Sequence, residues 1–116
     1  MKKSNLIVEK SFEFALLIIQ LYKQLQAEKE FVISNQLLRS GTSIGANVHE
    51  GISAESKKDF IHKFSISLKE ARETDYWLKL LDQSDLTCID VKFHLNEAQR
   101  LIRILSAIII SSKKNV

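Results

Sequence analysis

Residues 60–81 read FIHKFSISLKEARETDYWLKLL and carry a strict helical pattern. Small or apolar side chains recur in it at alternating spacings of four and three, which is the period of an α-helix that buries one face. The members of this row are Phe60, Phe64, Ser67, Ala71, Thr74, Leu78 and Leu81. Upstream, Ser56 followed by Asp59 resembles a capping box and predicts that the helix begins at Lys57.

Two other helical segments carry more apolar surface than one partner helix can cover. Residues 5–26 present two neighbouring apolar rows. A second capping signature, Thr87 to Asp90, precedes a helix whose C-terminal half is apolar nearly all round. The first helix has the rows Val8, Phe12, Ala15, Ile19, Tyr22 and Phe14, Ile18, Leu21, Leu25; the last has Val91, Leu95, Ala98, Ile102, Leu105, Ile109, with Leu101, Ile104, Ile108 and Ile110 on other faces. Apolar surface that one bundle cannot cover generally marks an interface, so we expect self-association. The alternative is an irregular bundle that buries both rows itself.

A helix over about residues 29–53 carries two interior glycines, Gly41 and Gly45, on its apolar row. Each costs roughly 1 kcal/mol relative to alanine, and close approach to a neighbouring helix is the usual reason for that cost. Glu28 and Glu30 suit the positive end of this helix.

The four segments together predict one domain over residues 1–116, an all-α, antiparallel up-down-up-down four-helix bundle that is oligomeric. Zero Pro and three Gly in 116 residues argue against a turn-rich β domain. One Cys allows no internal disulfide, which favours a reducing, cytoplasmic location. The longest apolar run, residues 14–19, is too short to cross a bilayer, so no membrane partner is expected.

Polar residues follow one face of the second helix and continue as carboxylates on the third. We expect Arg39 to pair with one of these carboxylates. The stripe consists of Arg39, Ser43, Asn47 and Glu50, and the carboxylates are Glu70 and Glu73. One interpretation is a polar lock that fixes which helices pair; the other is an active site of paired carboxylates. Because no His or Cys nucleophile joins the stripe, we favour the lock and predict a protein that is not an enzyme.

Metal ligands are poorly represented. A ferritin-like di-metal bundle needs Glu-x-x-His on two helices, and only His62 has an acidic residue three positions earlier, Asp59. No metal or cofactor is therefore predicted. Cys88 is expected at a helix start as a packing residue.

A second row on the third helix lies about 160° from Phe60 and Phe64 and is expected to face solvent. This basic row consists of Lys58, His62, Ser65, Lys69, Arg72, Tyr76 and Lys79. All of its formal charges are positive, and with Tyr76 for base stacking it suits a phosphate backbone. The formal net charge of +3 is compatible with such a partner. The alternative is an ordinary solvated face, since carboxylates lie close by. If the basic row does not bind nucleic acid, the remaining candidate binding residues lie at the chain ends. They are Lys2, Lys3, Lys113 and Lys114.

The run QLLRSGTSIGANVHEG, residues 36–51, resembles the Gln-Leu-x-Arg-Ser…Ser-Ile-x-Ala-Asn…Glu-Gly signature of a family of four-helix bundles encoded within 23S rRNA intervening sequences. Residues 60–81 look like the third helix of the same family. Gly45 stands where many relatives carry Pro, so a straighter helix is expected there.

The resemblance implies a closed homopentamer, similar to the pentameric barrel of the accessory protein of diversity-generating retroelements. It implies binding of RNA or other nucleic acid, brings no enzyme activity, and places all six polar residues of the second and third helices on family motif positions. We therefore expect a non-catalytic nucleic-acid-binding or scaffolding protein. The alternatives are a module that recruits another protein and, third, an enzyme that uses the carboxylates.

Overall fold

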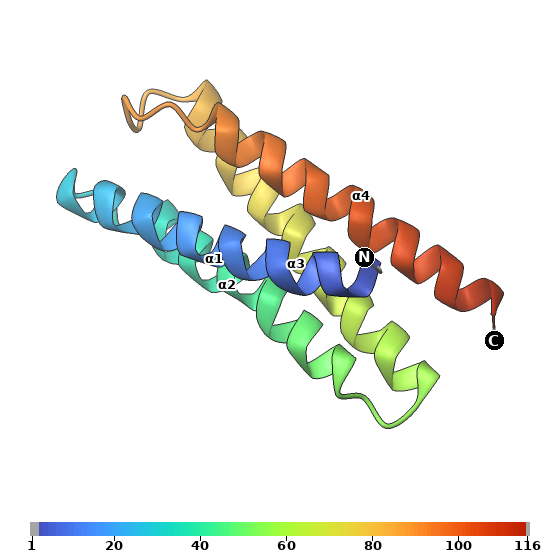
Figure 1. The fold of residues 1–116 in the computed structure, drawn as a ribbon. Coiled ribbons are helices and arrows are strands. Elements are labelled where there is room, and N and C mark those ends of the chain that lie inside the picture. Colours follow the sequence, from blue (N-terminus) through green and yellow to red (C-terminus); the bar gives the residue numbers. More distant parts are fainter. Residues whose placement is uncertain (1–2, 116) are drawn as a thin grey trace.

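The computed structural model describes residues 3–115, with side chains from residue 5 onward, and this part of the chain forms four α-helices and no strand. They are α1 (Lys3–Ala27), α2 (Val32–Ile52), α3 (Lys57–Gln83) and α4 (Lys92–Lys114). Consecutive helices run antiparallel and lie side by side (Figure 1), within 47 × 22 × 20 Å. The predicted all-α four-helix bundle is confirmed. None of these helices combines the length and the apolar character needed to cross a membrane.

The predicted core face of α3 is correct almost residue by residue. Of its seven members, six are buried and Phe60 is partly buried. On α1 only one of the two apolar rows faces the core, namely Phe14, Ile18, Leu21 and Leu25. The other row is partly exposed, and Phe12 is 57% exposed. The bundle therefore does not bury both rows by itself.

Both interior glycines of α2 lie where α1 approaches closely. A Cβ added to Gly41 would lie 2.9 Å from the side chain of Ile18, and one added to Gly45 would lie 3.4 Å from the Ser11 carbonyl oxygen. The predicted reason for these glycines is thus confirmed, and the neighbouring helix is α1. The helix continues through Gly45 without a break, as expected for a chain that lacks Pro there.

The α1–α2 turn shows why the predicted start of α2, near residue 29, was three residues too early. Lys29 adopts a left-handed conformation with φ 66°, which ends α1. The carboxylate of Glu30 then accepts hydrogen bonds from the backbone N–H groups of Ile33 (3.1 Å) and Ser34 (2.8 Å). Glu30 therefore stabilises the N-terminus of α2, as predicted. Glu28 instead accepts a hydrogen bond from the Thr87 hydroxyl at 2.6 Å.

The predicted start of the last helix after Thr87 was wrong. The Thr87 hydroxyl oxygen accepts a hydrogen bond from the backbone N–H of Ile89, and Asp90 accepts one from that of Lys92. These side chains form successive turns in the connection over residues 84–91, and α4 begins only at Lys92. Cys88 is consequently exposed in this connection and is not a packing residue at a helix start.

Candidate functional site

The basic row occupies the outer face of α3. All seven of its side chains are exposed, because the core positions of this helix lie on the opposite side. At 1.5 Å per residue, the row from Lys58 to Lys79 extends about 32 Å along the bundle. Tyr76 is 55% exposed and contacts Trp77 edge to face, with ring centroids 5.3 Å apart. One aromatic face is thus available beside the cations.

Two carboxylates near the basic row form ion pairs, one with a member of the row and one with a residue of α2. Asp75 pairs with Lys79 at 3.0 Å, and Glu73 pairs with Arg39 of α2. Within residues 5–115, the side chains of Lys58, Lys69 and Arg72 form no ion pair. The charges of these three residues are therefore not engaged in ion pairs within that range, although Asp59, Glu70 and Asp75 lie close to them in the sequence.

Arg39 reaches across from α2 to both predicted carboxylates of α3. Its Nη1 lies 3.3 Å from Glu70 Oε2, and its Nη2 pairs with Glu73. Glu73 also accepts a hydrogen bond from the indole N–H of Trp77 at 3.0 Å. The Arg39 side chain is 49% exposed, so this cluster lies on the rim of the α2–α3 interface rather than inside it.

The other residues of the predicted stripe do not join this cluster. The Ser43 hydroxyl donates to the carbonyl oxygen of Arg39, and the Asn47 amide donates to that of Ser43, so both bond to their own helix. Glu50 forms a separate ion pair with Lys63 at 2.9 Å. The side-chain hydrogen bond to Glu50, together with its charge, raises the pKa of Lys63.

A fully buried polar contact between α2 and α3 was missed by the sequence reasoning. The hydroxyl oxygens of Ser40 and Thr74 lie 2.8 Å apart, and the Ser67 hydroxyl donates to the carbonyl oxygen of Ile44 at 2.8 Å. The signal that could have found it is present: Ser67 and Thr74 occupy core positions of α3, where a hydroxyl needs a partner.

The described residues form no cluster of metal ligands. Across residues 5–115, no three His, Cys, Asp or Glu side chains gather in a way that could hold a metal ion. Glu70 and Glu73 both pair with Arg39. His94 is partly buried, and burial lowers its pKa while the charge of Asp90 opposes that effect.

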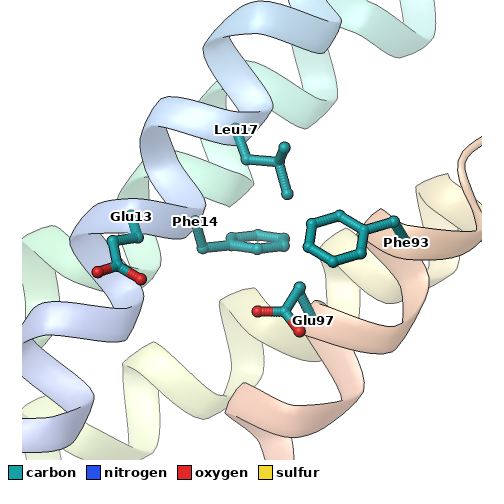
Figure 2. A pocket seen from close by; sticks show the side chains of 5 residues that line it. All are labelled: Glu13, Phe14, Leu17, Phe93 and Glu97. Atoms are coloured by element: carbon teal, nitrogen blue, oxygen red, sulfur yellow. The ribbon is translucent and has the colours of Figure 1, made fainter.

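A pocket of about 150 Å³ lies between α1 and α4 (Figure 2). These two helices make the least extensive contact of the neighbouring pairs. The pocket is lined by Glu13, Phe14, Leu17, Phe93 and Glu97. Sequence reasoning did not single it out, because Phe93 and Glu97 belong to none of the periodic rows.

These features define a class of protein: an antiparallel four-helix bundle with a positively charged outer face on its third helix. The chain belongs to the 23S rRNA-intervening sequence protein family, whose family model matches residues 3–109. The resemblance noted in residues 36–51 and 60–81 is thereby confirmed.

The fold is similar to a crystal structure of a protein of unknown function from the S23 ribosomal protein family of Bacteroides thetaiotaomicron. The two chains are 47% identical, the match covers 93% of this chain and 98% of the other, and the TM-score is 0.88. No curated protein matches the chain. The pentameric state and the kinship with the retroelement accessory protein stay predictions.

Proposed function

We propose that this protein is a non-catalytic, oligomeric RNA-binding bundle and that the basic row of α3 is its binding surface. The observation that carries the proposal is the exposure of Lys58, Lys69 and Arg72 on one helix face, without an ion pair in the described residues. The family's association with 23S rRNA supports RNA as the first polymer to test.

The physical basis of binding is the release of counterions from phosphates as they meet lysine and arginine side chains. Cations spaced along a straight helix can follow a strand, and an exposed aromatic ring such as that of Tyr76 provides a stacking surface that tolerates any base. Both properties favour single-stranded RNA without strong sequence preference.

Oligomerisation is proposed through the apolar side chains that the single bundle leaves exposed. On α1, Phe12 and Leu16 are 57% and 51% exposed, and on α4 Ile110 is 56% exposed. A homopentamer, as the resemblance implies, would present five copies of the basic row and a formal charge of 5 × 3 = +15. Weak contacts of single subunits would then add by multivalency.

The test is a binding isotherm with fluorescently labelled single-stranded RNA, measured alongside light scattering. We expect a species several times heavier than the 13.3 kDa chain, and an affinity that falls steeply between about 50 and 200 mM salt. An oligomer that binds no RNA at the lower salt would contradict the RNA proposal and favour a module that recruits another protein. A monomer at micromolar concentration would contradict the assembly proposal.

A further inference from the structure

The pocket between α1 and α4 is lined by two aromatic rings and two glutamates, of which Glu97 turns its carboxylate toward the rings and Glu13 turns its carboxylate away (Figure 2). Phe14 and Leu17 of α1 point toward Phe93 of α4, and the carboxylate of Glu97 lies beside the rings (Figure 2). Glu13 completes the lining from α1. The pocket has a volume of about 150 Å³. A cavity of that volume holds one small group, such as a benzene ring.

No residue lining the pocket is positively charged. Burial lowers the pKa of His94, the residue after Phe93, and so disfavours a positive charge on its ring. Among the side chains of residues 5–115, Lys10 alone pairs with the lining, at 3.4 Å from Glu13, and the Glu13 side chain is 53% exposed. Such an exposed ion pair contributes little and is easily exchanged. Glu97 forms no ion pair within residues 5–115.

Aromatic faces and carboxylates favour the same kind of ligand. A phenyl ring attracts a cation over its face, by about 0.5–1 kcal/mol at an exposed site. A carboxylate accepts paired hydrogen bonds from a planar cation such as a guanidinium or amidinium group. Phe14 is 3% exposed and Phe93 is 62% exposed, so the pocket has an apolar floor and an open side.

We propose that this pocket binds a planar organic cation on a short apolar stem, with the stem against Phe14 and Leu17 and the charged group between Phe93 and Glu97. The site is separate from the basic row of α3, and its charge preference is the reverse of that row. It therefore does not rest on RNA binding.

The test is titration of the protein with butyramidinium, followed through the methyl resonances of Leu17, with butyramide as the neutral ligand of nearly the same shape. We expect saturable shifts with butyramidinium, and binding by butyramide at least fivefold weaker. A second arm uses N-acetyl-arginine amide: binding comparable to that of butyramidinium assigns the site to a protein side chain, and much weaker binding assigns it to a free small cation.

Two variants and one control complete the test. Glu97→Gln should weaken butyramidinium binding about fivefold, and Phe93→Leu about threefold by removal of the ring. Glu55→Gln removes one exposed negative charge in the α2–α3 connection and should leave the affinity unchanged. Equal binding of butyramidinium and butyramide, no binding of either cation, or equal effects of Glu97→Gln and Glu55→Gln would overturn the proposal. RNA binding by Glu97→Gln should persist, which separates the two surfaces.

Discussion

Thr74 of α3 places its hydroxyl oxygen 2.8 Å from the hydroxyl oxygen of Ser40 of α2, and neither side chain is exposed. The Thr74 oxygen also lies 2.8 Å from the backbone carbonyl oxygen of Glu70. Because each hydroxyl has one proton, Thr74 donates to that carbonyl and accepts from Ser40. The buried polar contact between α2 and α3 is thus a pair of hydroxyls, whereas the Arg39 cluster lies at the rim.

Thr74→Val keeps the shape of the side chain but leaves the Ser40 hydroxyl buried without its partner. We expect the free energy of unfolding to fall by about 1–2 kcal/mol. The double variant Ser40→Ala with Thr74→Val removes both polar groups and should be more stable than Thr74→Val alone. Urea denaturation of both variants measures this. Ser40→Ala alone completes the double-mutant cycle, and strictly additive losses of the two single variants would show that the two hydroxyls do not depend on each other.

Arg39→Ala tests whether the rim cluster is a strong lock. With the Arg39 side chain 49% exposed, its ion pairs are screened by water, and we expect a loss of about 1 kcal/mol. Arg103→Ala is the matched control, since Arg103 is exposed on α4. A loss near 3 kcal/mol or more for Arg39→Ala would instead be that of a buried ion pair.

Gly41 and Gly45 offer a comparison on one helix. Gly41→Ala brings a Cβ to 2.9 Å from the fully buried Ile18, and we expect overpacking to cost about 1–3 kcal/mol. Gly45→Ala meets Ser11 only at 3.4 Å and gains helix propensity, so it should be neutral or stabilising by up to about 1 kcal/mol. Thermal and urea unfolding should order the two variants in this way. The reverse order would mean that α1 does not pack on α2 as described.

The pKa of His94 makes stability depend on pH. Because burial lowers its pKa below 6.5 in the folded state, the unfolded chain takes up the proton more readily. Stability is therefore full above pH 6.5 and declines as the pH falls through and below that value. We expect the urea midpoint to drop between about pH 7.5 and 5.5 and His94→Gln to lessen the drop. His62→Gln, at an exposed position, should retain it.

The sequence was most informative where one face of a helix is buried. The spacing of Phe64, Ser67, Ala71 and Thr74 predicted the core side of α3, and therefore also the exposed side that carries the basic row. The sequence did not predict which side of α1 is buried, because this helix has two neighbouring apolar rows. Only its packing against α2 and α4 determines that the row of Phe14 and Ile18 faces the core.

Local hydrogen-bond signatures were less dependable. Ser56 accepts from the Asp59 N–H and begins α3 as predicted, whereas Thr87 and Asp90 have the same spacing and form turns before α4. The pairing of Arg39 with the carboxylates of α3 was predicted from spacing, but its exposure depends on the tertiary distance between helices. The pocket at Phe93 is formed by α1 and α4, which are far apart in the chain. No periodic pattern in the sequence indicates that its lining residues lie together.

The role of the basic row in RNA binding is tested by the salt dependence of RNA binding by the variant Lys69→Gln with Arg72→Gln. Removing two phosphate contacts should weaken binding and reduce the slope of log K against log salt by about 1.4, at about 0.7 for each contact on a single strand. Arg100→Gln with Arg103→Gln lowers the net charge equally, from exposed positions on α4, and should leave the slope nearly unchanged. If the two double variants behave alike while the oligomer stays intact, the outer face of α3 is not the RNA-binding surface.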